Sequence, residues 1–367
     1  MNDTPALSGL DSLGDLLALD ALAAQATGLS EPNPRVACRL LLADGRVFEG
    51  HTQQAGGPHA EVMALRAAQA AGADTRGATA IVTLEPCSHH GRTPPCCDAL
   101  IAASVARVIV ALADPNPLVG GQGIARLRAA GIEVELLPTG HPLALASRER
   151  NIGFLSRMVR GLPWVRMKMA ASLDGTTALA NGASQWITAE AARRDGHAWR
   201  ARAGAIVTGI GTVLEDDPRL DVRLAETAHQ PLRVLVDSRL ELPLDARIIA
   251  PPGALLLYTA CDPAAMQEKR AALADRGVTV IDCPGPARAG AQAKVDLPGL
   301  LRDLARRGVN ELHVEAGHKL NGSLLREGLV DELLLYLAPK LLGPGMRLAN
   351  IGPLTELEQG IELEIVE

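Results

Sequence analysis

Four side chains in the first half of the chain constrain its fold more than any other feature of the sequence. His59 and Glu61 stand two positions apart at the expected start of a helix, and Cys87 and Cys96 each follow a proline further along. One imidazole and two thiolates can hold a zinc ion while the fourth tetrahedral position stays open for water. The fold must therefore bring residues 59, 87 and 96 to one point.

This spacing indicates a particular chemistry. An H-x-E triplet with a later proline-cysteine motif is the signature of zinc-dependent nucleobase deaminases. Zinc lowers the pKa of a bound water toward neutrality. Glu61 could then take the water proton and pass it to the ring nitrogen and the departing amine. Eight residues separate Cys87 from Cys96 instead of the usual two, and Gly91 and the prolines suit a loop that returns the second thiolate.

Two alternatives stay open for these residues. His89, His90 or Cys97 could complete a closed four-ligand zinc site that is purely structural. His59 alone could be an ordinary core or surface histidine. We expect Cys97 to be a packed bystander, because neighbouring positions on a helix point about 100° apart.

The order of expected elements predicts two α/β domains. We place a deaminase domain at residues 16–160 and a second domain at residues 161–367, divided near Gly161 and Pro163. The expected strands are 36–42, 79–84, 107–113, 132–137, 164–172, 205–209, 233–237, 255–259, 278–282, 311–315, 332–338 and 361–366. The expected helices are 61–71, 97–103, 122–130, 141–160, 189–201, 297–307 and 320–327. Such alternation places helices on the faces of a sheet.

Charge and composition narrow the function classes. A net charge of −6 and only 2% aromatic residues argue against a nucleic-acid partner, which needs a basic face and stacking rings. No apolar run reaches the length of a membrane span, and the N-terminus lacks a signal-peptide pattern. We therefore expect a cytoplasmic protein with reduced cysteines that acts on a small molecule.

The second half contains two glycine-bearing segments, residues 208–212 and 315–322. Glycines before a helix N-terminus can cradle a phosphate, but they are also common in plain turns. Neither segment fits G-x-G-x-x-G, so a standard dinucleotide-binding fold is not indicated.

Longer stretches resemble one known family. Residues 58–62 (PHAEV), 83–96 (TLEPCSHHGRTPPC) and 114–117 (DPNP) closely resemble the bifunctional riboflavin biosynthesis deaminase/reductases. Further similar stretches are residues 168–175, 184–188, 211–218 and 314–317. The resemblance implies a cytidine-deaminase-like α/β/α domain followed by a dihydrofolate-reductase-like α/β domain, in a dimer or tetramer of identical chains.

The resemblance also implies site residues. Zinc would be held by His59, Cys87 and Cys96, with Glu61 as the catalytic proton carrier. Asn33 and His51 would lie near the pyrimidine ring. NADPH would be held by Ala170, Trp186, Thr212, Asp216, Ser238, Gly317, His318, Lys319, Leu320, Asn321, Gly322 and Ser323. The reductase substrate would be held by Ser184, Arg200, Leu220, Arg223 and Glu315. Asp221 departs from the family, which usually has threonine there.

The implied activity has two steps. The first removes an amino group from 2,5-diamino-6-ribosylamino-4(3H)-pyrimidinone 5′-phosphate, and the second reduces the ribosyl chain of the product with NADPH. Two rival hypotheses are a deaminase of nucleic-acid bases with a binding module, and a zinc-stabilised scaffold without activity.

Overall fold

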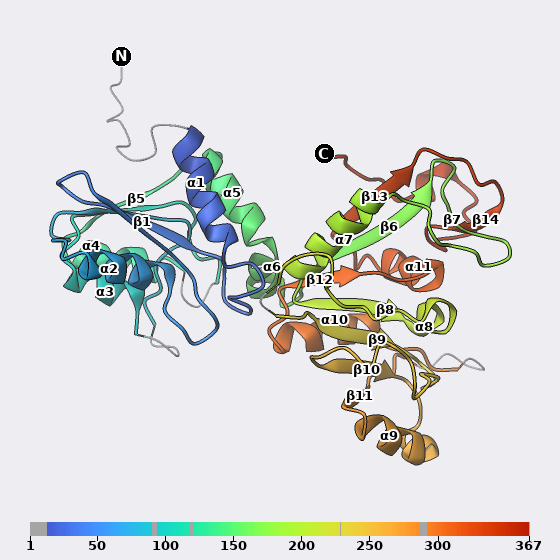
Figure 1. The fold of residues 1–367 in the computed structure, drawn as a ribbon. Coiled ribbons are helices and arrows are strands. Elements are labelled where there is room, and N and C mark those ends of the chain that lie inside the picture. Colours follow the sequence, from blue (N-terminus) through green and yellow to red (C-terminus); the bar gives the residue numbers. More distant parts are fainter. Residues whose placement is uncertain (1–12, 90–93, 117–119, 228, 287–291, 367) are drawn as a thin grey trace. The chain divides into compact units, whose positions relative to one another are not determined.

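The computed structural model describes residues 13–89, 94–116, 120–227, 229–286 and 292–366 (Figure 1). Its contacts divide the chain into two compact units. The first unit is Met1–Trp164 with Thr227–His229 and Arg302–Glu311, and the second unit is the remainder. The bounds 16–160 and 161–367 stay a prediction, because short later segments join the first unit. Throughout the described ranges, every helix is too short or too polar to cross a membrane.

The first unit contains a five-stranded sheet in the order β2-β1-β3-β4-β5. Its strands are β1 (Ala37–Leu41), β2 (Val47–His51), β3 (Thr79–Val82), β4 (Arg107–Val110) and β5 (Glu133–Leu136). β1 pairs antiparallel with β2 and β3, whereas β3, β4 and β5 run parallel. Successive side chains of a strand point to opposite faces, so Val108 and Val110 enter one core and Ile109 enters the other.

Helices cover both faces of this sheet (Figure 1). One face carries α2 (Ala60–Ala70), α3 (Cys96–Ala102) and α4 (Gln122–Ala129), and the other carries α1 (Leu13–Ala24) and α5 (Pro142–Arg150). The backbone of α2 lies so close to β2 that a Cβ on Gly50 would be 2.5 Å from the Ala60 carbonyl oxygen. This close approach fixes the start of α2, and with it His59 and Glu61, against the sheet.

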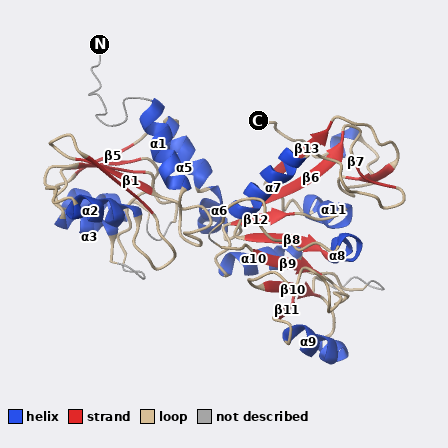
Figure 2. Cartoon of the chain, in the orientation of Figure 1, coloured by secondary structure: helices blue, strands red, loops and turns tan. Residues whose placement is uncertain are grey.

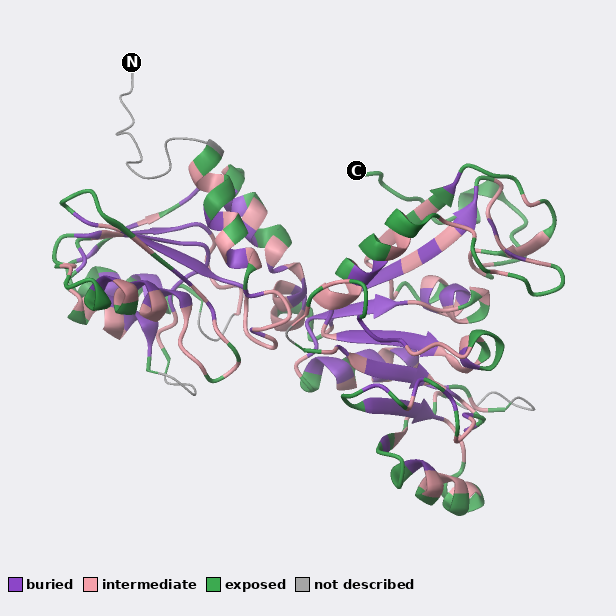
Figure 3. Cartoon of the chain, in the orientation of Figure 1, coloured by how far each residue is buried: buried purple, intermediate pink, exposed green. Residues whose placement is uncertain are grey.

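The second unit contains a seven-stranded sheet in the order β11-β10-β9-β8-β12-β6-β13. The strands are β6 (Trp164–Ser172), β8 (Ala205–Gly209), β9 (Leu232–Val236), β10 (Leu255–Thr259), β11 (Val278–Asp282), β12 (Glu311–Val314) and β13 (Glu332–Ala338). A two-stranded sheet joins β7 (Thr176–Leu179) and β14 (Gly345–Arg347). The central strands β8 to β10 are buried along most of their length (Figure 3), which matches their mainly apolar sequences.

The helices of the second half are α7 (Glu190–Arg202), α8 (Ile210–Asp216), α9 (Gln267–Ala274), α10 (Leu297–Arg306) and α11 (His318–Arg326). α8 directly follows β8, and α11 begins four residues after β12 ends. β9, β8 and β12 are neighbouring parallel strands. Their carboxyl ends therefore share one edge of the sheet, the usual place for a ligand in such a fold.

Two predicted elements were wrong. The helix predicted over residues 141–160 is two helices, α5 and α6 (Ile152–Arg160). The break falls at Asn151, whose buried side chain exchanges two hydrogen bonds with the backbone of Arg35 at 2.7 and 3.0 Å. The strand predicted over residues 361–366 does not form; this segment is loop (Figure 2), and its apolar side chains are largely exposed.

Candidate active sites

The sequence-predicted zinc ligands meet in the first unit. Nδ1 of His59 lies 3.6 Å from Sγ of Cys87 and 3.3 Å from Sγ of Cys96. His59 is the N-cap of α2, and Cys96 is the first residue of α3. The backbone N–H of Cys96 donates a hydrogen bond to Sγ of Cys87 at 3.3 Å. Helix N-termini favour negative charge, so both helix starts favour a thiolate here.

These spacings fit a zinc ion. Tetrahedral coordination with ordinary Zn–N and Zn–S bond lengths separates nitrogen from sulfur by about 3.5 Å. Among the described residues, His59, Cys87 and Cys96 form one group of three metal ligands within 4.8 Å of one another. His89 lies nearby in the pocket wall, and His90 falls outside the described residues. Cys97 is buried, and its thiol contacts the carbonyl oxygens of Pro86 and Gly123 at 3.3 and 3.6 Å.

The charges of the cluster suit both metal binding and proton transfer. The hydrogen bond with Cys96 and the contact with His59 lower the pKa of Cys87 to about 4, against the effect of burial. The hydrogen bond with Cys87 raises the pKa of His59, because the imidazole and the thiolate share a proton that a metal ion would displace. Burial raises the pKa of Glu61, whose side chain is in the first turn of α2 and only 3% exposed. A carboxyl group with a raised pKa can hold a proton that it has accepted.

A hollow of about 200 Å³ opens beside this cluster. His59, Glu61 and Cys87 line it together with Asn33, as predicted from the resemblance. His51 is not among its lining residues, and the neighbouring Thr52 is, so the role of His51 stays a prediction. The other lining residues are Pro34, Val36, Leu84, Glu85, His89, Asp114, Asn116, Phe154 and Met158.

In the second unit, several of the residues predicted to hold NADPH gather at the carboxyl edge of β9, β8 and β12. Oγ1 of Thr212 in α8 accepts the backbone N–H of Gly317, the N-cap of α11, at 3.1 Å. Ser238 follows β9, and its hydroxyl accepts the N–H of Val295 at 3.2 Å. A Cβ on Gly211 would meet no atom within 4 Å. Open space beside two helix starts fits a phosphate-bearing cofactor.

Most of the remaining residues predicted to hold the cofactor lie in α11, and two others, Ala170 and Trp186, lie earlier in the chain. His318, Lys319, Leu320, Asn321, Gly322 and Ser323 form the first turns of α11. Of these, Asn321 and Gly322 are buried, and a Cβ on Gly322 would be 2.0 Å from the Asn350 carbonyl oxygen. These two therefore pack α11 onto the segment near Asn350. Ala170 lies on β6, and Trp186 is 64% exposed with the Arg193 guanidinium 4.6 Å from its ring centre.

The residues predicted to bind the reductase substrate also cluster. Arg200 forms two hydrogen bonds with the carboxylate of Glu315 and a third with the carbonyl oxygen of Asp221. Burial raises the pKa of Glu315, but the charge and hydrogen bonds of Arg200 outweigh it and hold the pKa well below the usual range. Ser184 donates to Asp216 at 3.3 Å, and Leu220 is buried.

Arg219 is a cation that the sequence analysis did not single out. Asp221 binds Arg219 at 2.8 Å and Arg223 at 2.9 Å, and these two side chains are 40% and 49% exposed. Arg200 is only 12% exposed, and three hydrogen bonds hold its guanidinium group inside the fold. Arg219 and Arg223 are thus the guanidinium groups of this cluster that can still reach a phosphate. Their spacing around Asp221, Arg-x-Asp-x-Arg, was the available sequence signal.

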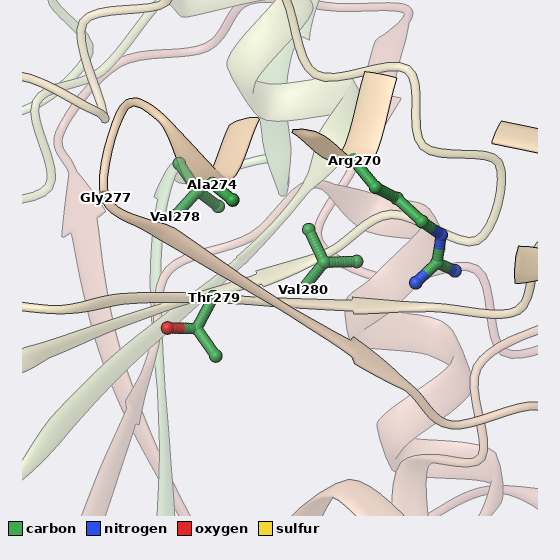
Figure 4. A pocket seen from close by; sticks show the side chains of 6 residues that line it. All are labelled: Arg270, Ala274, Gly277, Val278, Thr279 and Val280. Atoms are coloured by element: carbon green, nitrogen blue, oxygen red, sulfur yellow. The ribbon is translucent and has the colours of Figure 1, made fainter. Parts of the chain in front are cut away.

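A second hollow of about 470 Å³ lies against α9 and the edge strand β11 of the second unit (Figure 4). Arg270 is its ionisable residue, and it is already paired with Asp282. None of the predicted site residues lines this hollow. It offers no group for proton or hydride transfer, so we do not assign it to an active site.

Comparisons with known proteins match two different family models to two separate parts of the chain. Residues 15–112 match the family model of the cytidine and deoxycytidylate deaminase zinc-binding region, and residues 163–366 match that of the RibD C-terminal domain. The riboflavin biosynthesis protein RibD of Escherichia coli is 46% identical over 87% of this chain and 85% of its own length. The RibD protein of Aquifex aeolicus is 36% identical over 94% and 91%.

Solved structures give the same assignment. Acinetobacter baumannii RibD superposes with a TM-score of 0.82 at 40% identity, covering 96% of this chain and 93% of that one. A Thermotoga maritima diaminohydroxyphosphoribosylaminopyrimidine deaminase/5-amino-6-(5-phosphoribosylamino)uracil reductase gives 0.82 at 30% identity with the same coverage. The predicted order, a cytidine-deaminase-like domain followed by a dihydrofolate-reductase-like domain, is confirmed. The chain belongs to the RibD family of riboflavin biosynthesis proteins.

Proposed function

We propose that this chain is a bifunctional enzyme of riboflavin biosynthesis that uses zinc in one domain and NADPH in the other. The first reaction deaminates 2,5-diamino-6-ribosylamino-4(3H)-pyrimidinone 5′-phosphate. The second reduces the ribosyl chain and gives 5-amino-6-(5-phosphoribitylamino)uracil. The observation that carries the proposal is the approach of His59, Cys87 and Cys96 to within metal-binding distance beside the buried Glu61.

In the deaminase domain, His59, Cys87 and Cys96 would hold the metal. When bound, zinc polarises a water molecule and lowers its pKa. Glu61 would accept a proton from the attacking water and donate it to the ring nitrogen. It would then take the second proton from the hydroxyl group added to the ring carbon and pass it to the amine, which leaves as ammonia. The burial that raises the pKa of Glu61 makes its carboxyl group a suitable temporary carrier for that proton.

When bound in the reductase domain, NADPH would supply the hydride that reduces the ribosyl chain. Thr212, Ser238 and the start of α11 hold the cofactor at the sheet edge. Arg223, together with Arg219, binds the 5′-phosphate by charge-assisted hydrogen bonds. Arg200 keeps Glu315 ionised, so that this carboxylate can accept hydrogen bonds from the substrate.

We also propose the domain bounds 16–160 and 161–367, a homo-oligomer that is a dimer or a tetramer, and a cytoplasmic location. Light scattering after size-exclusion chromatography would measure the mass of the assembly directly. A mass of one chain, 38.4 kDa, would contradict the oligomer.

One time course tests the function. Purified chain is incubated with the diaminopyrimidine phosphate, with and without NADPH, and the product masses are followed. We expect ammonia release in both samples and NADPH oxidation only after deaminated product has formed. Zinc without any turnover would favour an inactive scaffold, and micromolar affinity for single-stranded DNA or RNA would favour a deaminase of nucleic acids.

A further inference from the structure

Glu85 is a buried carboxylate with an unusual set of partners. One oxygen accepts the backbone N–H groups of Asp114 and Gly121, both at 3.0 Å. The other oxygen accepts those of Gly123 and Ile124 at 2.9 and 3.2 Å. All four donors lie 29 to 39 positions further along the chain. Hydrogen bonds to an ionised acceptor are about twice as strong as neutral ones, so this carboxylate is a strong local anchor.

The anchored backbone forms one wall of the deaminase pocket. Asp114 and Asn116 both line that pocket. The N–H of Asn116 donates to the Asp114 side chain at 2.9 Å, and the carbonyl oxygen of Asn116 accepts from Gly120 at 2.7 Å. Glu85 thus holds the backbone on both sides of Asn116, at Asp114 and at Gly121.

The same residue is tied to the metal site by a short piece of backbone. Glu85 precedes the ligand Cys87 by two positions. At Gly123, a Cβ would lie 2.1 Å from the Pro86 carbonyl oxygen and 3.1 Å from Oε1 of Glu85. The start of α4 therefore packs directly on the Glu85-Pro86-Cys87 backbone, and only glycine permits this approach.

We propose that Glu85 is a positioning residue for the deamination. Its carboxylate fixes the pocket wall at Asp114 and Asn116 relative to the Cys87 ligand. Glu85 therefore affects the reaction by holding these pocket residues in place. A displacement of about 1 Å in substrate-positioning groups can lower activity about 100-fold. The expected effect of Glu85 on the deamination rate rests on the proposed function. Its anchoring of the pocket wall rests on the hydrogen bonds alone.

The test compares Glu85→Gln with Glu133→Gln, the same substitution at an exposed strand position of the same sheet. The NH2 group of glutamine cannot accept, so two of the four backbone donors lose their acceptor. In Glu85→Gln we expect kcat/KM of deamination to fall at least tenfold, mainly through a higher KM. Zinc content and the reductase activity of the same chain stay within twofold of wild type. Glu85→Asp, which keeps the charge on a shorter side chain, recovers part of the loss.

Hydrogen exchange supplies a readout that does not need activity. The amides of Asp114, Gly121, Gly123 and Ile124 should exchange at least tenfold faster in Glu85→Gln, while those of α2 are unchanged. Unchanged exchange overturns the inference, as does a kcat/KM equal to that of Glu133→Gln. Loss of zinc from Glu85→Gln also overturns it, in favour of a role in holding the metal. A wild type that releases no ammonia counts against the proposed function, and the exchange rates still decide the inference.

Discussion

Arg200 and Glu315 form a largely buried ion pair with two hydrogen bonds, and Glu315 directly follows β12. The side chains are 12% and 17% exposed. Removing one partner of a buried pair leaves an uncompensated charge, which costs about 3–5 kcal/mol. The pair therefore has a structural role as well as its proposed contact with substrate.

Glu315→Gln should reduce the free energy of unfolding of the reductase domain by about 3 kcal/mol. Urea denaturation followed by tryptophan fluorescence measures it, because Trp186 and Trp199 both lie in the second unit. The matched control is Glu190→Gln, whose pair with Arg194 is exposed on α7 and should contribute less than about 1 kcal/mol. Equal losses of unfolding free energy in the two variants would show that the Arg200–Glu315 pair stabilises the domain no more than an exposed pair does.

Asp221 places a negative charge between Arg219 and Arg223, and these are the groups proposed to bind phosphate. Asp221→Asn removes the charge. It keeps an acceptor for only one of the two guanidinium groups, because the NH2 group of asparagine cannot accept. Relief of about 1 kcal/mol of repulsion lowers the KM for the reductase substrate about fivefold, with kcat unchanged. Steady-state kinetics measures this. An unchanged or higher KM would mean that the phosphate binds elsewhere or that the charge itself is required.

His197 gives the second unit a defined response to acid. Burial and the charges of Arg200 and Arg223 lower its pKa from 6.5 to about 4, and its neutral Nδ1 accepts the N–H of Arg223 at 3.2 Å. The unfolded chain binds this proton more readily than the folded chain. Stability is therefore present above about pH 6.5 and is lost as the pH falls toward 4.

Measuring the melting temperature as a function of pH tests this effect. The fall in melting temperature between about pH 6.5 and pH 4 should be smaller in His197→Gln than in wild type. Magnetic resonance of the histidine ring gives an independent check. A His197 signal that titrates near pH 6.5 would contradict the proposed environment.

Removing the metal should separate the two activities. A chelator leaves the His59, Cys87 and Cys96 side chains close together without the ion, so deamination is lost and the first unit becomes less stable. The reductase domain has its own core, so NADPH oxidation with deaminated product should stay within twofold. Addition of Zn²⁺ should restore deamination. If the chelator abolished both activities together, the claim that the deaminase and reductase sites work independently would be contradicted.

The metal cluster could be predicted from the sequence because few other sites combine an H-x-E triplet with two later proline-cysteine pairs. The spacing of His59, Cys87 and Cys96 required one meeting point, and the structure provides it. The strands 205–209 and 255–259 were also predicted with their observed bounds, because buried parallel strands are short, mainly apolar runs.

Other features depend on contacts between distant segments, which no local pattern contains. The break at Asn151 depends on hydrogen bonds with Arg35, and Glu85 resembles an ordinary polar residue until its four backbone donors are seen. Arg200 was expected to bind the reductase substrate, but its pairing with Glu315 became visible only in the fold. In each case the partner lies far along the chain.

The most direct test of the central claim is the deamination rate of Glu61→Gln measured together with its zinc content. The amide cannot carry the proton, so the rate should fall about 10²- to 10⁴-fold while one zinc per chain and the reductase activity are retained. A rate near that of wild type with zinc still bound would show that Glu61 is not the proton carrier.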